Sequence, residues 1–500
     1  MIFTTLPFLF FLLVVLGFYW SLRSDSWRQP LLLAANFFFY GWWDWKFTAL
    51  LGFVILISYL GGLFVQQATP GSLWRKQIMR IACVLLLGVL GYFKYTNFFL
   101  GSLQGVIESL GGHVGWSTLK IILPAGISFY IFQAISYVVS VYRGKLLAES
   151  SVIRLGVYLS FFPHLVAGPI IHAPTFLPQL TSKRLFQAPF FIEGARKFAL
   201  GFLYKAVFAD HLAVPVNTVF STLHDQTPLT IFGGCLGFYG QIYFDFAGYS
   251  LMAIGVANLL GYTLPDNFNF PYRATSLIDF WRRWHISLST WLRDYVYIPL
   301  GGNRCTLSRH YFNIIVTMFL GGMWHGASWN FLLWGGIHGL ALCLNHMWRS
   351  MSNWGQATNL DKGLGKLKKT SLPFVKICSL TPIAGSWLLT QGVVFLCWIP
   401  FRAATLQDTL FIFHQWSVAL MRLGSFFVKP LALSAAVLAF PWLLVLLPVL
   451  IDTVLNGSSR LRERWSLHST TALYAIIIVA FFLGLLFMHS GTVNFIYFQF

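Results

Sequence analysis

Long apolar runs without charge alternate with short polar segments from one end of the chain to the other. Several approach the roughly 20 residues that a helix needs to cross a bilayer. These runs are Leu6–Trp20, Phe47–Val65, Ile81–Phe93, Ile231–Phe244, Trp387–Phe401, Leu431–Ile451 and Thr470–Met488. The pattern predicts an all-α polytopic membrane protein of about 11–13 membrane segments, with one membrane domain filling residues 1–500.

Three apolar segments have lengths that do not fit whole crossings: 155–180, 280–300 and 311–345. The first is rich in Pro and has basic residues on both sides, which predicts a re-entrant segment. The third is too long for one helix and too short for two full spans, which predicts a broken hairpin with its apex in the membrane. Irregular backbone at membrane depth is tolerated only inside the protein or around a wet cavity. We therefore expect a buried chamber, and a chamber implies a substrate.

Basic residues indicate the topology, because Lys and Arg concentrate in cytoplasmic loops. The first apolar run is preceded by no charge and followed by Arg23 and Arg28, which places the N-terminus outside and the first loop inside. The Lys- and Arg-free segment 100–119 falls outside on the same rule. No basic n-region precedes the first run and no small-residue cleavage pattern follows it, so it is predicted to be a retained membrane helix.

The composition supports this class: 57% of the 500 residues are hydrophobic and only 10% are charged. Lys and Arg outnumber Asp and Glu by 34 to 15, but no basic stretch lies in a separable soluble domain. The excess therefore reflects topology, and we expect a lipid bilayer around the protein and no nucleic-acid partner. The six Cys residues lack Cys-x-x-Cys spacing and are predicted to be free packing residues.

His325 is the strongest candidate for chemistry. It lies midway along the third segment, between Trp324 and Gly326, and an ionisable residue inside a membrane is a functional candidate by default. Removal from water disfavours the charged imidazolium, so this His is expected to be neutral and able to act as a general base. The alternative is a packing His that is hydrogen-bonded to a neighbouring helix.

His285 lies in the stretch 279–297, whose pattern predicts one amphipathic helix at the membrane interface, with His285 at the edge of the apolar face. An interface His beside a belt of Trp is an equal alternative. On the polar face Arg282, Arg283 and Arg293 are candidates to hold lipid phosphate or the phosphates of a nucleotide-type donor.

Asp245 is a carboxylate in an apolar stretch, and it is predicted either to orient a His or to pair with a buried Arg. No metal site is predicted, because His164, His172, His338 and His346 lack ligand-like spacing. No phosphate-binding loop or nucleophile elbow occurs. Two classes fit these residues: a group transferase, and a transporter that uses His as a proton relay. The lack of an internal repeat favours the enzyme.

The run from Phe280 to Gly302, continuing through Trp324-His325-Gly326, resembles the bacterial branch of the membrane-bound O-acyltransferases (MBOATs), of the alginate O-acetyltransferase type. Supporting motifs include Phe162-Pro-His-Leu-Val-Ala-Gly-Pro and Tyr243-Phe-Asp-Phe-Ala-Gly-Tyr. The likeness is densest over about 238–339 and weaker in the C-terminal helices of 383–500. It implies an MBOAT-type bundle around a buried catalytic chamber.

The resemblance also implies that His325 is the catalytic His and that His285 holds the second important position. Trp324, Ser328, Asn330 and Asp245 are candidates to support the oxyanion or the substrate. No cofactor is expected to be bound, and the donor is expected to be acetyl-CoA, used from the cytoplasmic side of the bacterial inner membrane. Expected partners are an exported polysaccharide such as alginate and a periplasmic or membrane-anchored acetyltransferase. The closest rival is D-alanyl transfer in teichoic acid modification.

Overall fold

The computed structural model describes residues 1–113, 119, 121–358 and 373–421, together with 478–479, 481–483, 485–486 and 496. The described chain is helical and contains no strand. It forms two compact units: 1–211 with 243–266 and the described part of 468–500, and 212–242 with the described part of 267–467. The apolar run Leu431–Ile451 and most of Thr470–Met488 lie outside the described residues. The single domain over 1–500 stays a prediction.

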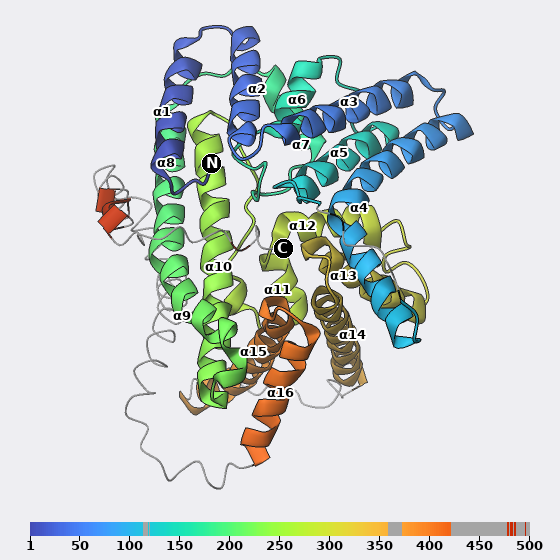
Figure 1. Ribbon diagram of the computed structural model, residues 1–500, viewed down its shortest axis with the longest axis vertical. Helices are drawn as coiled ribbons and strands as arrows, with labels where there is room; N and C mark the ends of the chain where they lie inside the picture. The colour runs from blue at the N-terminus through green and yellow to red at the C-terminus, as the bar shows by residue number, and fades with distance from the viewer. Residues whose placement is uncertain are drawn as a thin grey trace, which may run out of the picture. The chain divides into compact units, whose positions relative to one another are not determined.

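The first unit begins with a series of helices (Figure 1), and two of them, Leu6–Ser21 and Lys46–Gln67, match the apolar runs Leu6–Trp20 and Phe47–Val65 closely. Within it α3, α4 and α5 pack on one another, and α6 packs on α2 and α3. The helices are α1 (Leu6–Ser21), α2 (Asp25–Gly41), α3 (Lys46–Gln67), α4 (Leu73–Ser109), α5 (Ile127–Tyr142), α6 (Val152–Ser160), α7 (Ala173–Thr181) and α8 (Ala188–Leu203). Two further helices, α9 (Asp210–Ser221) and α10 (Pro228–Leu259), contribute residues to both units.

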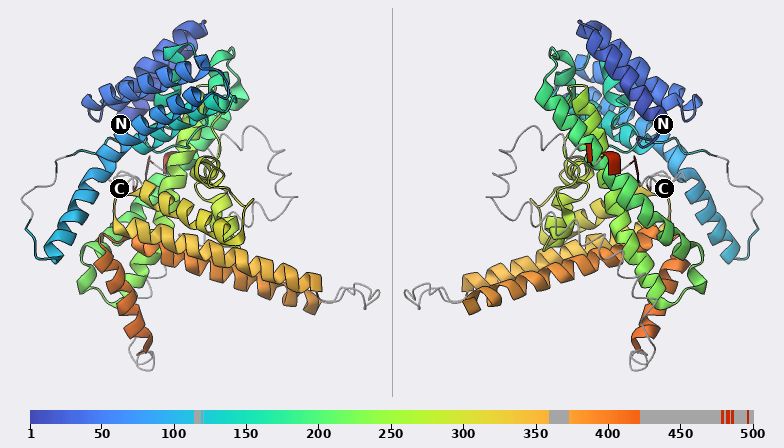
Figure 2. Two further views of the ribbon diagram at one scale, coloured as in Figure 1. Left: turned by 90° about the vertical axis from the view of Figure 1, so that its right-hand side faces the viewer. Right: turned by 90° about the vertical axis from the view of Figure 1, so that its left-hand side faces the viewer.

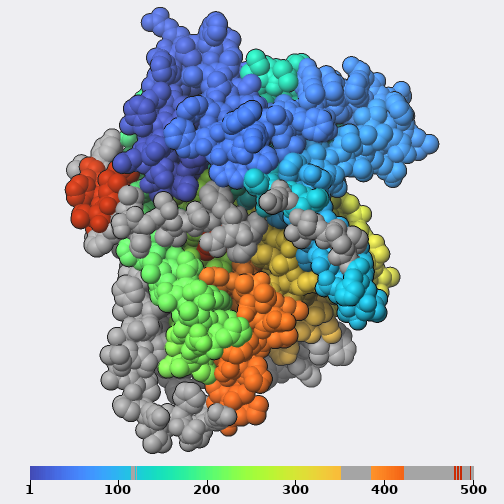
Figure 3. Space-filling view, in the orientation of Figure 1, coloured from blue at the N-terminus to red at the C-terminus, as the bar shows by residue number. Residues whose placement is uncertain are grey.

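Large apolar side chains remain exposed on several of these helices. On α1, Leu6 and Phe10 are 71% and 72% exposed, and Phe53 and Phe64 of α3 are each 51% exposed. The side chains of α1, α3 and α4 are drawn in shades of blue in the space-filling view (Figure 3). So much exposed apolar surface is unfavourable in water but favourable in the hydrocarbon core of a bilayer. The protein is therefore an integral membrane protein.

Five helices of the described chain are long and apolar enough to cross a membrane. They are Lys46–Gln67, Leu73–Ser109, Ala188–Ser221, Pro228–Leu259 and Ala384–Arg402. Two shorter apolar helices are Leu6–Ser21 and Ile127–Tyr142. The predicted polytopic helical class is confirmed, while the count of about 11–13 segments for the whole chain stays a prediction.

The segment 155–180 is broken, as its Pro content indicates. Helices α6 and α7 are joined by the irregular stretch 161–172, of which every residue except His172 is buried. Within this stretch the His164 ring Nδ1 lies 3.0 Å from the Gln133 side-chain nitrogen of α5. The position of the segment 155–180 relative to the membrane stays a prediction.

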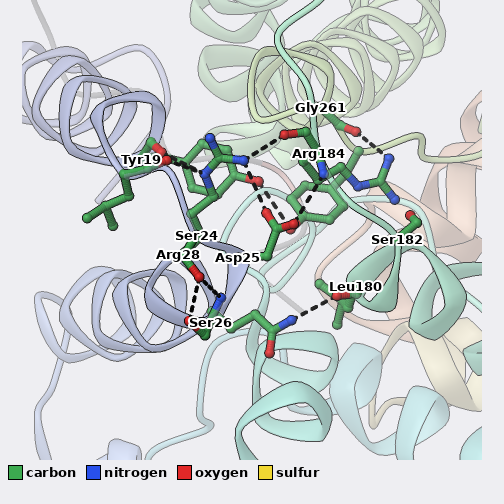
Figure 4. A network of polar contacts seen from close by, with 12 residues as sticks. Tyr19, Ser24, Asp25, Ser26, Arg28, Leu180, Ser182, Arg184 and Gly261 are labelled. Carbon is green, nitrogen blue, oxygen red and sulfur yellow. Dashed lines mark hydrogen bonds and ion pairs between the residues drawn. The ribbon is translucent and has the colours of Figure 1, made fainter.

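Arg28 ties the first two helices to a later segment of the same unit (Figure 4). It was assigned to the first loop from sequence, but it lies in the first turn of α2 and is only 7% exposed. Its guanidinium donates to the carbonyl oxygens of Tyr19 and Leu22 at the end of α1 and to the carbonyl oxygen of Arg184. Asp25 balances the charge at 3.1 Å. A cation thus satisfies carbonyls that a helix C-terminus leaves unpaired.

A buried charge cluster lies where α8 passes through a π-helical turn, η1 (Tyr204–Ala209), into α9. The Lys205 ammonium nitrogen is 2.7 Å from Asp210 and 2.8 Å from Asp245, and all three side chains are at most 10% exposed. Asp245 also accepts a hydrogen bond from the Ile496 backbone N–H at 2.8 Å. Asp245 is thus paired with a buried cation, as one of the two predicted alternatives held, but the partner is Lys205 and not an Arg.

The second unit is built around four longer helices and several short ones. Helix α14 packs on both α13 and α15, and Figure 2 shows α14 and α15 running side by side. The elements are η2 (Leu223–Asp225), η3 (Pro271–Arg273), α11 (Leu277–Arg283), α12 (Ile286–Leu292), η4 (Arg293–Tyr297), α13 (Leu307–His325), α14 (Trp329–Thr358), α15 (Pro373–Arg402) and α16 (Leu406–Met421).

Helices α13 and α14 form the hairpin that was predicted for the segment 311–345, joined by residues 326–328. Glycines allow the two backbones to approach closely. A Cβ on Gly322 would lie 2.2 Å from the Phe331 carbonyl oxygen, and one on Gly335 would lie 2.5 Å from the Met318 carbonyl oxygen. The hairpin is therefore closed by direct backbone packing, and it brings His325 to its apex.

Candidate active site

The stretch 279–297 is not one amphipathic helix, so that prediction is wrong. Helix α11 ends at Arg283, α12 begins at Ile286, and His285 between them has φ of 43°, in the left-handed region. This conformation is strained for a residue other than Gly and tends to occur at functional sites. The predicted sidedness holds in part, since Trp284 and Leu288 are buried while Arg282 is exposed.

His285 is fully buried, and Asn267 holds it in place. The Asn267 side-chain oxygen lies 3.1 Å from His285 Nδ1 and accepts hydrogen bonds from the Ser287 backbone N–H and hydroxyl at 3.3 and 2.8 Å. Because a backbone N–H can only donate, this atom of Asn267 is the oxygen, and His285 Nδ1 must donate to it. The proton therefore sits on Nδ1, and Nε2 carries the lone pair of the ring.

His325 is the last residue of α13 and is 3% exposed. The chain turns away at Gly326, where a Cβ would lie 2.1 Å from the ring of Phe331. A larger residue at this position would require the Phe331 ring, a side chain of α14, to move. The Gly after His325 thus leaves room for the Phe331 ring.

The two predicted histidines meet in an aromatic cluster. Their ring centroids are 6.3 Å apart, and the Trp324 ring lies 5.5 Å from His285. Trp334 of α14 and Phe401 of α15 lie 4.9 and 5.1 Å from the His325 ring. Residues separated by 40 positions in sequence are thereby placed within one site, which has mainly aromatic walls.

An apolar cavity of about 160 Å³ reaches this site. His325 and Trp334 line its buried part, and Arg293, whose side chain is 58% exposed, also lines it. Most of the remaining wall comes from α12 and α13, including Leu288, Leu292 and Met318. The cavity therefore gives a small apolar group a path to the His325 ring.

The three arginines predicted to contact phosphate differ in their surroundings. Arg283 is held 2.9 Å from Asp279 and also donates to the Asn269 carbonyl oxygen. Arg293 lies 2.7 Å from Asp294 and lines the cavity, while Arg282 is exposed to solvent. Arg293 is thus the one whose position links the polar surface with the cavity.

The residues predicted to support the oxyanion or the substrate also lie in different parts of the structure. Trp324 is in the site, and Ser328 is half-buried in the hairpin turn. The Asn330 amide donates to the Ala403 carbonyl oxygen at 2.8 Å and accepts from Thr409 at 3.2 Å, which ties α14 to α16 and favours a structural role. Asp245 belongs to the other unit, where Lys205 engages it.

Asn267, Trp334 and Phe401 are site residues that sequence reasoning did not find. Asn267 precedes the helices in an irregular segment, and the two aromatics are ordinary members of apolar helices. In the described part of the chain, no group of three or more His, Cys, Asp or Glu side chains is placed to hold a metal ion. Cys83, Cys235, Cys305, Cys343 and Cys397 are free, but Cys305 is exposed and not a packing residue.

The family model of the membrane-bound O-acyltransferases matches residues 149–360, which contain both histidines. The chain is 38% identical over 426 residues to the probable alginate O-acetylase of Azotobacter vinelandii, over 84% of this chain and 80% of that protein. The chain belongs to the membrane-bound O-acyltransferase family. It is thus an O-acyltransferase.

Two further relatives of this O-acyltransferase carry different names. It is 32% identical over 437 residues to the peptidoglycan O-acetyltransferase of Helicobacter pylori, over 81% of this chain and 77% of that protein. It is 32% identical over 248 residues to the teichoic acid D-alanyltransferase of Bacillus subtilis, over 46% of this chain and 61% of that protein. The names share the transfer of an acyl group, acetyl or D-alanyl, while the acceptors that they name differ.

Proposed function

We propose that this O-acyltransferase takes an acetyl group from acetyl-CoA in the cytoplasm and moves it across the bacterial inner membrane for O-acetylation of an exported polysaccharide such as alginate. The observation that carries the proposal is the apolar cavity that His325 lines. Its size and walls suit a short acyl chain. The 80% coverage of a probable alginate O-acetylase supports the choice of polymer.

In this mechanism neutral His325 accepts the proton of an acceptor hydroxyl, and the hydroxyl oxygen attacks the thioester carbonyl carbon. The carbon–sulfur bond then breaks, and the departing thiolate takes the proton from His325. Protons and electrons balance, and neither metal nor cofactor is needed. The Trp324 indole N–H, Ser328 and backbone N–H groups of the hairpin turn are candidates to stabilise the oxyanion.

The other predicted residues act around this step. His285, with its lone pair on Nε2, would orient a substrate or assist proton movement from its position 6.3 Å from His325. Arg293 would hold a phosphate group of the donor where the cavity meets the polar surface. A periplasmic or membrane-anchored acetyltransferase would complete transfer to the polymer. The N-terminus lies outside in this arrangement.

The test is the amount of ester-linked acetate on exported polysaccharide from cells with wild-type protein, His325→Ala or no protein, at matched membrane levels. General-base catalysis contributes roughly 10²–10⁴-fold, so His325→Ala should lose acetate by about that factor. His346→Ala is the matched control, because this half-buried His lies on the same hairpin, beside His310. It should keep normal acetate.

Near-normal acetate from His325→Ala would refute the general-base role. If acetate is equal with and without the protein, D-alanine esters should be measured next, because a D-alanyltransferase is among the relatives. A transporter would instead move a solute across proteoliposomes without changing donor or acceptor covalently.

A further inference from the structure

Trp334 lies at the centre of the aromatic cluster and is 1% exposed. Its ring is 4.9 Å from His325 on one side and 4.8 Å from His338 on another. Trp281 and Trp398 lie 5.7 and 6.2 Å away and restrict its movement. The indole is therefore fixed against the candidate base by residues from α11, α14 and α15.

The chemistry at His325 creates a charge where water is scarce. A neutral imidazole that takes a proton becomes a cation, and His325 is only 3% exposed. Burial of a cation is costly without a compensating interaction. None of the described residues that line the adjoining cavity is Asp or Glu. Contacts that favour the protonated ring would therefore raise the rate at which His325 takes the proton.

Aromatic faces attract cations when the charge lies within about 6 Å of the ring centroid, and Trp does so best. Trp334, Trp324 and Phe401 all lie 4.9 to 5.1 Å from the His325 ring centroid. Of these three rings, Trp334 is the nearest to His325, and Trp is the ring type that attracts cations best. Trp334 also lies on a different helix, α14, from His325. It also has neighbours on its other sides that keep it in place.

We propose that Trp334 is a positioning residue that stabilises the protonated form of His325 during acyl transfer through the π system of its indole. The proposal rests on the general-base role of His325 given above. The proton still passes from the acceptor hydroxyl to His325 and then to the thiolate, and Trp334 neither gains nor loses one. Its effect is on the rate at which the proton is taken.

The experiment replaces Trp334 by tryptophans with increasing numbers of ring fluorines, by site-specific incorporation into the full-length protein. Each fluorine withdraws electron density from the indole face and barely changes its size. Membrane vesicles receive radiolabelled acetyl-CoA at varied concentration, and label in the polysaccharide is measured. We expect kcat to fall stepwise by roughly twofold to thirtyfold across the series, with KM for acetyl-CoA unchanged.

The same series at Trp398 is the matched control. Trp398 is also 1% exposed, and its ring contacts in the described chain are with Trp284, Trp334 and Phe401. Fluorination there should leave kcat unchanged. A flat series at Trp334, or a kcat that rises with fluorine, overturns the proposal.

Wild type and His325→Ala in the same vesicles separate this proposal from the one on which it rests. Equal incorporation by those two refutes the general base, and the role of Trp334 falls with it. A large loss in His325→Ala combined with a flat fluorine series refutes the role of Trp334 alone.

Discussion

Single residues at the site are held by partners that are distant in sequence. The Asn267 side-chain oxygen accepts three hydrogen bonds, and one of them fixes the proton of His285 on Nδ1. Its backbone oxygen also accepts from the Ile286 N–H at 2.9 Å, at the first residue of α12. Asn267 thus determines both the tautomer of His285 and the start of the helix that follows it.

We expect Asn267→Ala to lower acyl transfer by roughly tenfold, because His285 would lose the acceptor that orients its ring. The measurement is ester-linked acetate at matched membrane levels. Asn269→Ala is the control: this exposed Asn lies two residues later and makes its hydrogen bonds through its backbone. Equal acetate from the two variants would show that His285 does not need Asn267.

At the scale of elements, the packing of the α13–α14 hairpin requires Gly only on the face of α14 that contacts α13. A Cβ at Gly335 would meet the Met318 carbonyl oxygen at 2.5 Å, whereas a Cβ at the adjacent Gly336 would meet nothing within 4 Å. Gly335 is therefore needed for packing, and Gly336 is not. The two residues form a matched pair one position apart.

Gly335→Ala should destabilise the protein by about 1–3 kcal/mol, because the two helices must separate to admit the methyl group. Gly336→Ala should be neutral or stabilising by up to about 1 kcal/mol, since Ala is the better helix former. The unfolding temperature of the full-length protein in detergent measures both. A Gly335→Ala variant as stable as Gly336→Ala would contradict the close packing.

At the scale of the whole molecule, the basic residues imply an orientation in the membrane. Helix α4 has 37 residues, and about 55 Å of helix is longer than the roughly 30 Å hydrocarbon core. Arg75, Lys76 and Arg80 in its first turns predict that this end is cytoplasmic. Its far end, which precedes His113, is then expected outside.

Single cysteines on either side of α4 test this orientation. In a background with the native Cys replaced by Ser, Thr69→Cys and His113→Cys occupy exposed positions before and after the helix. A membrane-impermeant maleimide should label His113→Cys from the periplasmic side and Thr69→Cys only after the membrane is opened. The reverse pattern would place the N-terminus inside.

The sequence by itself determined the helical membrane class, the hairpin around His325 and the two candidate histidines. An apolar run predicts a helix in lipid because backbone N–H and C=O groups in hydrocarbon must pair with one another. Gly-rich or Pro-rich stretches indicate where helices end. An ionisable residue in such a run is conspicuous for the same reason. These signals are local in the sequence, so a single sequence is enough to recognise them.

Only the tertiary structure decided which residues surround those histidines. The break at His285 depends on Asn267, 18 positions earlier, and overrides a helical pattern that continues through it. Trp334 and Phe401 reach His325 because three helices pack together, and Lys205 reaches Asp245 across 40 positions. Periodicity specifies the face that a helix buries, but the partner on the other side is chosen by packing between distant segments.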